Sequence, residues 1–444
     1  MALPFAIPAY VAAYVYADML GPFGPVAQVI GVQNLPEIRS MPGAVFILTL
    51  MTYPYVYLAM RASFAGRSSA LLEAARMLGV GPVRAALNIL LTAGRPALAG
   101  GLALVLMETA ADFGVADYFG VKTLSVGIFR TWQGLGDLAG ATQLAAGLFL
   151  VALIFVLLED ITRRGESAEN TKAYRNTSRI KLAPHHAVIA ILFCTIPIML
   201  GFIFPAADLI GKLNSDLSAI AGRNLVSAIS NTSMIAVSGA IIAISLALAL
   251  AYSARQMRSL IGKTLLRIAS LGYAIPGAVI AIGILSLTAG QTYINSATLF
   301  GGVIILLYAY TVRFLTAGYN SAAAGLSQIS IQMDHAARSL GAGGWRILTE
   351  IHWPQVSGAV LAGAAIIAID IAKELPATLL LRPFNFETLS THIYRLASDE
   401  RLADAAPAAL ILIGLGLVPT LALTFLSGHK KTGGNLEAPA GQSL

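Results

Sequence analysis

The sequence predicts an all-α membrane protein with about ten transmembrane helices, arranged as two parallel and similar halves. Of its 444 residues, 57% are hydrophobic and only 11% are charged, which is more apolar surface than a water-soluble core of this length needs. The apolar stretches are continuous and about 20 residues long, whereas the strands of a membrane barrel would show short alternating patterns. A polar segment that occurs once in each half indicates an internal duplication.

Ten apolar stretches are long enough to cross a bilayer as helices. They cover residues 3–20, 41–60, 96–113, 139–159, 187–205, 226–252, 270–289, 299–318, 355–373 and 405–427. The stretch between the fourth and the fifth is rich in Arg, Lys, Glu, Asn and Ser, which is typical of an exposed connection. We therefore expect a first half at 1–159, a linker at 160–186, a second half at 187–427 and a polar tail at 428–444.

The repeated segment has the same spacing in both halves, 262 residues apart. Its first copy contains Glu73, Ala74, Ala75 and Gly79, and its second contains His335, Ala336, Ala337 and Gly341. Apolar residues near helical spacing before each Gly predict a short helix, a bend at the Gly and a second helix, which would form a compact knob. An interfacial amphipathic helix without a partner is the alternative. The matched spacing of two copies argues against it.

The duplication extends beyond this segment. Ile7-Pro8 matches Ile275-Pro276, and the stretch 123–130 matches 388–395. The second half has two expected spans ahead of its Ile-Pro pair, whereas the first half has none. We therefore expect that the first two helices of the first half are missing, through a misplaced start codon, a fragment or a natural truncation.

The placement of the basic residues predicts which side of the membrane the repeated segments face. The chain has 29 Lys and Arg residues and a net charge of +7. If the repeated segments face the cytoplasm, 19 of these 29 residues fall in cytoplasmic loops, as the positive-inside rule requires. Both termini would then be cytoplasmic. The net positive charge is explained by this placement beside the membrane lipid. It requires no nucleic-acid partner.

Four carboxylates lie at equivalent positions of the two halves. Glu108 and Asp370 each follow the start of the repeated segment by 35 residues, and Asp112 and Glu374 by 39. Each pair is therefore four residues apart on one helix face, at the end of an apolar run. Intramembrane carboxylates are costly unless they face water, a partner or a pathway, so we consider all four as candidates for a cation pathway. The structural alternative has equal weight for Glu108 and Asp370, and it is favoured for the other two.

That structural alternative is specific. Asp112 could cap a helix, and Glu374 could pair with Lys373 or Arg382.

At the repeated segment the chain resembles the permease subunit of ATP-binding-cassette (ABC) importers, whose cytoplasmic loop carries Glu-Ala-Ala, a Gly after three residues and Ile-x-Leu-Pro. The resemblance implies a type I importer permease fold in which each knob is a coupling helix that docks on an ATPase subunit. Two such motifs in one chain imply that both permease halves are fused. His335 replaces the family's Glu in the second copy, and Thr92 stands where Pro is usual in the first. These departures imply that the two sides couple unequally.

Two longer stretches are similar to iron(III)-type permeases of these importers. The first is Met107-Glu108-Thr109-Ala110-Ala111-Asp112-Phe113-Gly114, and the second runs from Lys373 through Glu374-Leu375-Pro376 to Pro383. The resemblance implies a permease for ferric iron in a bacterial inner membrane, with iron delivered by a periplasmic binding protein. Thiamine or another small solute carried by the same importer class is an alternative. An ion-driven secondary transporter with internal repeats is another.

The resemblance also assigns the chemistry to other chains. Two ATPase subunits would hydrolyse ATP, and this chain would be neither an enzyme nor a holder of any cofactor. Gly262-Lys263-Thr264 resembles the end of a nucleotide-binding loop, but Met257 occupies the position of its first Gly. No firm metal site is expected in the passage, because an importer must release its cargo. The segments 113–138 and 374–404 are expected to dock the binding protein.

Six tyrosines near the first spans could be read as ligands for ferric iron. They are Tyr10, Tyr14, Tyr16, Tyr53, Tyr55 and Tyr57. We discount this interpretation because tyrosine is common at membrane interfaces.

Overall fold

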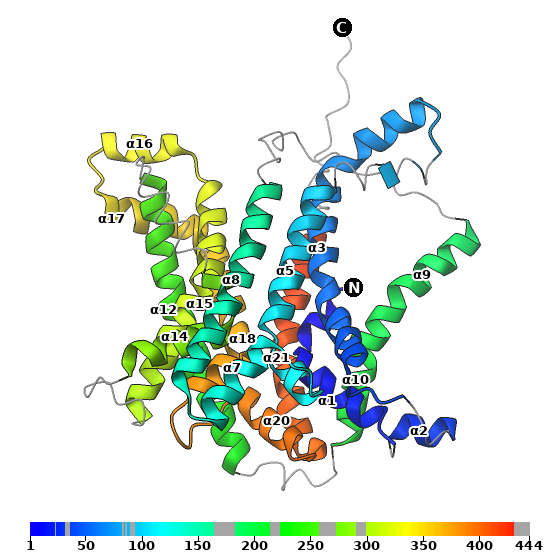
Figure 1. Ribbon diagram of the computed structural model, residues 1–444. Helices are drawn as coiled ribbons and strands as arrows, with labels where there is room; N and C mark the ends of the chain where they lie inside the picture. Colours follow the sequence, from blue (N-terminus) through cyan, green and yellow to red (C-terminus); the bar gives the residue numbers. More distant parts are fainter. Residues whose placement is uncertain are drawn as a thin grey trace.

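A computed structural model describes residues 1–22, 24–31, 36–81, 84, 87–88, 94–163, 183–213, 223–256, 272–289 and 299–429. Within these residues the chain consists of helices and their connections, without a strand, so the predicted all-α class is confirmed. Figure 1 shows the long helices side by side. The end of α3 (Met41–Met77) lies at the same end of the molecule as α16 (Ile331–Ser339), which carries the second repeated segment.

Six helices of the described part are long and apolar enough to cross a membrane. They are Met41–Phe64, Leu138–Glu159, Pro184–Gly211, Asn224–Arg255, Gly301–Ser327 and Gly344–Lys373. Two shorter apolar helices, Gly277–Thr288 and Leu402–Val418, fall at expected spans. The remaining two expected spans contain α1 (Ala9–Met19) and α5 (Arg95–Ala111). All ten predicted stretches therefore contain helix, although α1, α5 and Gly277–Thr288 are shorter than predicted.

Proline accounts for the shortening of two of these helices. Pro8 and Pro276 both have extended backbone, with φ of −61° and −55°, and each is the residue before a helix. A 3₁₀ turn precedes each proline, η1 (Leu3–Ala6) in the first half and η4 (Gly272–Ala274) in the second. A helix that continued through either proline would lose a hydrogen bond and meet a steric clash, because the ring removes the N–H donor and crowds the carbonyl four residues earlier. The 3₁₀ turn therefore ends before each proline, and the helix begins at the residue after it. The matched geometry supports the predicted duplication.

The elements after each proline follow the same order in both halves. The first half continues from α1 through α3, α5, α6 (Gly114–Tyr118) and α7 (Leu124–Phe129) to α8 (Leu138–Arg163). The second half has α14 (Gly277–Thr288), α15 (Leu299–Ser327), α18 (Trp353–Lys373), α19 (Pro376–Leu381), α20 (Leu389–Ser398) and α21 (Leu402–His429). The hydroxyls of Thr123 and Thr388 cap the equivalent helices α7 and α20 by accepting backbone N–H groups.

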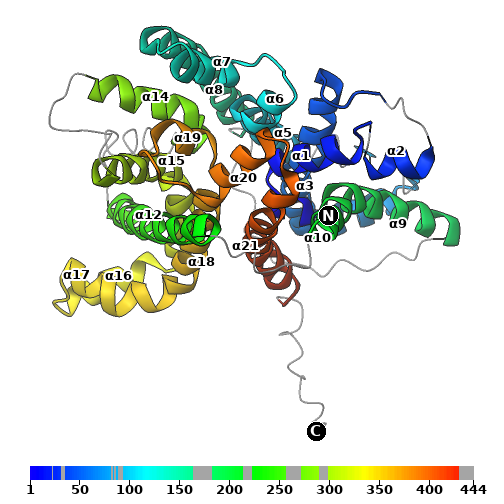
Figure 2. The same ribbon diagram turned by 90° about the horizontal axis from the view of Figure 1, so that it is seen from below.

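The last helix of each half packs against the first part of the other half. Helix α8 contacts α14, and Thr142 and Ser286 share a hydrogen bond of 2.8 Å between them. Helix α21 contacts η1 and α1 in the same way. This reciprocal exchange relates the halves by an approximate twofold arrangement, which Figure 2 shows from below. It also brings equivalent helix ends close to one another at the centre of the molecule.

Two further helical segments belong to the second half alone. Helix α12 (Arg223–Gln256) packs against α15 and α18 of its own half. The other segment, α9 (Pro184–Ile198) with the π turn η3 (Met199–Ile203) and α10 (Phe204–Gly211), crosses to the first half. There the Tyr16 hydroxyl donates to the Leu200 carbonyl at 2.5 Å.

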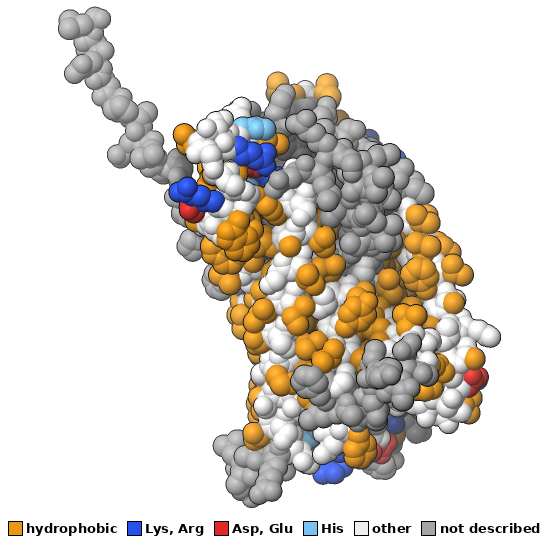
Figure 3. Space-filling view, turned by 90° about the vertical axis from the view of Figure 1, so that its left-hand side faces the viewer, with side chains coloured by type: hydrophobic (Ala, Val, Ile, Leu, Met, Phe, Trp, Pro, Cys, Tyr) orange, Lys and Arg blue, Asp and Glu red, His pale blue; other side chains and the backbone are white. Residues whose placement is uncertain are grey.

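The surface of the described chain matches a membrane environment. Helix α9 has no buried residue and leans away from the other helices. Most of its exposed side chains are apolar, including Ile189, Leu192 and Phe193, and the two histidines His185 and His186 lie in its first turn. Figure 3 shows hydrophobic side chains spread over the middle of one face, with charged ones near its two ends. This distribution is the one expected for helices in contact with lipid. The linker residues 164–182 and the tail residues 430–444 lie outside the described residues.

Candidate functional site

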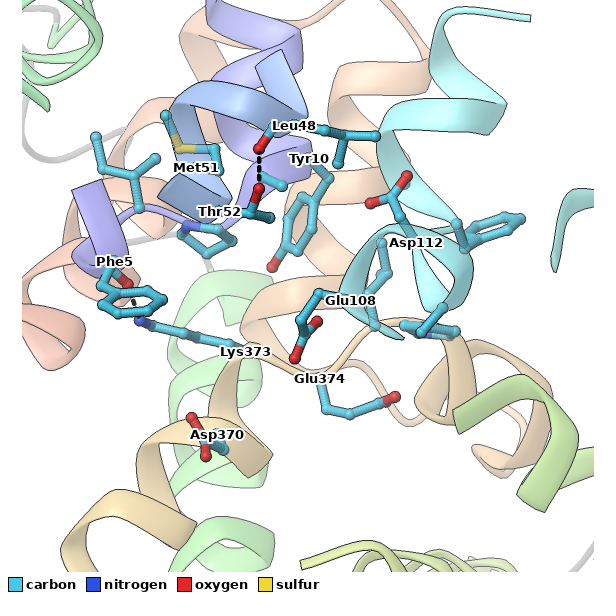
Figure 4. A pocket seen from close by; sticks show the side chains of 18 of the residues that line it. Phe5, Tyr10, Leu48, Met51, Thr52, Glu108, Asp112, Asp370, Lys373 and Glu374 are labelled. Atoms are coloured by element: carbon cyan, nitrogen blue, oxygen red, sulfur yellow. Dashed lines mark hydrogen bonds between the residues drawn. The ribbon is translucent and has the colours of Figure 1, made fainter. Parts of the chain in front are cut away.

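A cavity of about 240 Å³ lies between the two halves and is bordered by all four predicted carboxylates. The first half provides η1, the start of α1, the middle of α3 and the end of α5, and the second provides parts of α15, α18 and α19. Figure 4 shows Glu108, Asp112, Asp370 and Glu374 around this space. The sequence spacing thus identified residues that meet in one place. Their role in a pathway stays a prediction.

Asp112 and Glu374 are equivalent helix caps. Each is the residue at which its helix, α5 or α18, ends with extended backbone. Asp112 then accepts the Ala116 N–H at 3.0 Å, and Glu374 accepts the Thr378 N–H at 3.1 Å. Both carboxylates therefore satisfy donors at the start of the next short helix, where negative charge is favourable. The capping alternative is confirmed for Asp112 and extends to Glu374.

The predicted pairing of Glu374 with Lys373 or Arg382 was wrong. Glu374 instead forms an ion pair of 3.0 Å with Arg313 of α15. Consecutive residues on a helix point about 100° apart, and Lys373 turns toward η1, where its ammonium donates to the Phe5 carbonyl at 2.9 Å. The Arg382 guanidinium donates to the Phe386 carbonyl, outside the cavity.

Glu108 and Asp370 lie one turn before the caps and are half-buried. Glu108 accepts a hydrogen bond of 3.2 Å from the Tyr55 hydroxyl. Within the described part of the chain, no hydrogen bond to the Asp370 carboxylate is formed. These two groups are therefore the carboxylates of the cavity with the most capacity to bind something else.

The basic side chains that line the cavity come from the second half only. Arg313 and Lys373 line it, whereas the positions 262 residues earlier are Met51 and Ala111. Four carboxylates against two bases leave the cavity acidic. Sequence reasoning missed Arg313, although a charged residue inside the apolar run 299–318 was a usable signal, because such residues are rare in spans.

Both repeated segments contain the predicted glycine bend. Gly79 and Gly341 have left-handed backbone, with φ of 72° and 80°. In both copies the N–H of the next residue donates at 3.0 Å to the carbonyl of the second Ala, Ala75 or Ala337. This is the glycine-terminated helix end in which a side chain would be strained.

The two segments differ in how they join the membrane helices. The first ends the continuous helix α3, and the side chains of Glu73 and Ala74 lie outside those described. The second forms the separate helix α16, on which His335 and Ala336 are exposed and Ala337 is buried. The expected second helix of this copy is present as α17 (Gly344–Arg346) and the π turn η5 (Ile347–His352), which continue into α18. In the first copy, most of it lies outside the described residues.

Comparison with known proteins identifies the kind of transporter. Residues 1–164 match the family model described as "Binding-protein-dependent transport system inner membrane component". The first 164 residues are a permease domain of this family. The chain is accordingly a multi-span membrane protein of an inner-membrane transport system.

Curated relatives extend the similarity over the rest of the permease. The Fe(3+)-transport system permease protein FbpB 2 of Haemophilus influenzae is 26% identical over 428 residues, which cover 95% of this chain and 81% of the relative. A putative 2-aminoethylphosphonate transport system permease protein, PhnV of Salmonella typhimurium, is 27% identical over 146 residues, which are 33% of this chain and 53% of the relative. Among solved structures, a bacterial ABC transporter involved in alginate import aligns with a TM-score of 0.43 and 17% identity, over 56% of this chain and 96% of that one.

A buried ion-pair network anchors the second repeated segment of the permease. Asp334 of α16 accepts from Arg255 Nε at 2.9 Å and lies 2.7 Å from His352 Nε2. Arg255 also donates to the Leu326 and Ile329 carbonyls, at 2.6 and 2.8 Å. Burial acts to raise the pKa of Asp334, but the hydrogen bonds from Arg255 and His352 outweigh it and lower that pKa.

This anchor joins α16 to the helix that reaches the cavity. His352 is fully buried directly before α18, and α18 ends at Lys373, beside the cavity. The position equivalent to Asp334 in the first half is Leu72. The anchor therefore belongs to the second segment alone.

Charged side chains connect the halves at the opposite end of the molecule. Asp117 of α6 accepts from the Tyr394 hydroxyl of α20 at 2.8 Å and from Arg130 at 3.0 Å. Arg39 donates to Glu400 at 3.3 Å. These residues lie in or near the segments 113–138 and 374–404, whose predicted role in docking a binding protein stays a prediction.

Replacing Gly341 by Ala tests the glycine bend. The Gly341 Cβ position is open, so the expected cost of roughly 1 kcal/mol in unfolding free energy comes from the left-handed backbone alone. Gly358→Ala is the matched control, because that site is equally open and lies within helix α18, outside the left-handed backbone region. Thermal unfolding of the purified permease should show a lower midpoint for Gly341→Ala only. Equal midpoints would show that the bend imposes no strain.

Asp334→Ala tests the anchor. Losing charge-assisted hydrogen bonds to Arg255 and His352 should lower the unfolding free energy by roughly 1.5–3 kcal/mol. Glu350→Gln is the control, because the Arg346–Glu350 pair is exposed on the same segment and exposed pairs contribute at most about 1 kcal/mol. Amide hydrogen exchange over residues 331–339 should accelerate in Asp334→Ala and not in the control. Unchanged exchange in both variants would contradict the anchoring role.

Proposed function

We propose that this permease passes ferric iron across a bacterial inner membrane, taking it from a periplasmic binding protein. The observation that carries the proposal is the acidic cavity between the halves, in which Glu108 and Asp370 are the least engaged carboxylates. Hard cations prefer oxygen ligands, and carboxylates suit them. The named function of the Haemophilus influenzae relative, which this chain matches over 95% of its length, supports iron as the cargo.

The cargo named for the Salmonella relative, 2-aminoethylphosphonate, carries an ammonium as well as a phosphonate. A cavity with four carboxylates and two basic side chains could pair with both ends of such a zwitterion, so charge alone does not exclude it. Thiamine is cationic, so the charge of the cavity does not distinguish it from iron. The uptake experiment below must distinguish the two.

Energy would come from two ATPase subunits that dock on the two repeated segments, with Glu73, Ala74, Ala75 and Gly79 on one side and His335, Ala336, Ala337 and Gly341 on the other. Closure of the ATPases would draw the segments together and open the opposite face of the permease, and hydrolysis would reset it. ATP would thus be used by partner chains, and this chain would bind no cofactor. The second segment, which is anchored and lacks the family's Glu, would couple differently from the first.

The proposed orientation places the repeated segments in the cytoplasm. Arg255, Arg338 and Arg346 lie at that end of the described chain, in agreement with the positive-inside rule. The end of α21 would be cytoplasmic too, as expected for the carboxyl terminus. The Met1 carbonyl accepts a hydrogen bond of 2.8 Å from Tyr53, halfway along the span Met41–Phe64, so in this orientation the amino end would lie at membrane depth and not in the cytoplasm, where it was expected.

Uptake of radiolabelled ferric iron into iron-starved cells tests the proposal. The double variant Glu108→Gln/Asp370→Asn should slow uptake at least tenfold without lowering the amount of permease in the membrane, because it removes the two open carboxylates. Glu37→Gln, an exposed carboxylate away from the cavity, should behave as the unmodified protein.

Three other results would redirect the proposal. Loss of thiamine uptake with unchanged iron uptake would assign a different cargo. Uptake that follows an ion gradient and persists without the ATPase subunits would indicate a secondary transporter. Unchanged iron uptake in the double variant would return both carboxylates to a structural role.

A further inference from the structure

Tyr10 presents a buried hydroxyl to the cavity without any partner in the described part of the chain. The residue lies in the first turn of α1, just after Pro8, and only 6% of it is exposed. It lines the cavity, and its hydroxyl forms no hydrogen bond with a described residue. Figure 4 shows its ring directed between Thr52 and Glu108 toward the space that Glu108 borders.

Four neighbouring polar groups are engaged with other donors or acceptors, and the remaining carboxylate of the cavity, Asp370, forms no hydrogen bond with Tyr10. Thr52 donates to the Leu48 carbonyl at 2.7 Å, and Glu108 accepts from Tyr55. Asp112 caps α6, and Glu374 holds Arg313. A buried hydroxyl without a partner costs free energy. The partner that would remove this cost in the transport cycle is therefore a molecule in the cavity.

A glycine of α6 leaves room for the Tyr10 side chain. A Cβ at Gly114 would approach the Tyr10 Cβ to 2.4 Å, so the absence of a side chain at Gly114 allows α6 to pass over the tyrosine. The residue 268 positions later, at the equivalent point of the second half, is Ala278. Only the first half presents a phenol to the cavity. Because Tyr10 is buried in the protein, its place is not explained by the preference of tyrosine for membrane interfaces.

We propose that the Tyr10 hydroxyl contacts the cargo, with its oxygen directed at a hard cation or at a water bound to one, beside Glu108 and Asp370. This inference rests on the proposed function and names a contact within it. A neutral phenol is an oxygen ligand without formal charge, so it adds selectivity for a hard cation while holding it less strongly than another carboxylate would. Such a contact suits a passage that must release what it binds.

Tyr14 provides a matched control one turn further along α1. It is fully buried, its hydroxyl also has no partner among the described residues, and it does not line the cavity. Its ring packs edge-on against Tyr118 at 4.5 Å. Neither Tyr10→Phe nor Tyr14→Phe removes a hydrogen bond within the described chain, so neither should lower the thermal unfolding midpoint. Transport should separate the two variants.

The first measurement is ferric-iron uptake by the complete transporter with each variant. Tyr10→Phe should slow uptake at least fivefold at an unfolding midpoint that is unchanged or higher, and Tyr14→Phe should slow it less than twofold. Equal uptake by the two variants would overturn the proposal. A lower midpoint for Tyr10→Phe would also overturn it, because the hydroxyl would then have a structural partner.

The second measurement uses terbium(III), a hard trivalent ion whose luminescence is sensitised by a nearby tyrosine, with the purified permease alone. Tyr55 also lines the cavity and donates to Glu108, so the test is made in a Tyr55→Phe background. There, sensitised emission should fall at least threefold in Tyr10→Phe and be retained in Tyr14→Phe. Emission that is absent from the unmodified permease, or equal in both variants, would overturn the contact. The terbium measurement needs no ATPase. It therefore tests the contact of Tyr10 with a cation separately from the proposed ATP-driven import. Absence of iron uptake by the unmodified transporter would instead contradict the proposed function.

Discussion

Carboxylates at the ends of two membrane helices are the constraint on which the centre of this permease depends. Burying an ionised carboxylate in an apolar medium is costly unless donors or water compensate it. Asp112 and Glu374 are compensated by the first N–H groups of α6 and α19, which is possible only because α5 and α18 each end at the acid and turn at once into a short helix. Glu108 and Asp370 lie four residues before these helix ends. Their side chains are therefore directed at the space between the halves.

Duplication provides this arrangement twice, and later divergence makes the two copies unequal. Arg313, Lys373 and the anchor at Asp334 occur only in the second half, and Tyr10 occurs only in the first. Among the described residues, ion pairs thus connect the elements of the second half at its repeated segment and again at the cavity. The first half contributes a carboxylate, Glu108, that is held by one tyrosine hydroxyl. A cargo between the halves would meet different chemistry on its two sides.

Patterns along the chain were sufficient to predict what depends on local sequence. Apolar length predicted the helices, and the matched spacing predicted both the glycine bends at Gly79 and Gly341 and the equivalence of the four carboxylates. Pairings between helices were not predictable, because they depend on which faces meet after packing. Arg313 lies 61 residues from Glu374, and Arg255 lies 79 from Asp334. The predicted pair of Glu374 with Lys373 was wrong because residues that are adjacent in sequence point to different faces of a helix.

Access to the cavity from each side of the membrane is the most direct test of this account. The measurement places a cysteine at Ala111, which lines the cavity, in a Cys194→Ser background and follows its reaction with a small membrane-impermeant thiol reagent. Ala116→Cys, at a buried position of α6 outside the cavity, is the control. We predict that the Ala111→Cys variant reacts from one side of the membrane in the resting transporter and from the other side when the proposed ATPase subunits are trapped with nucleotide. An unreactive Ala111→Cys variant, or one that reacts from both sides at once, would contradict a passage with alternating access between the halves.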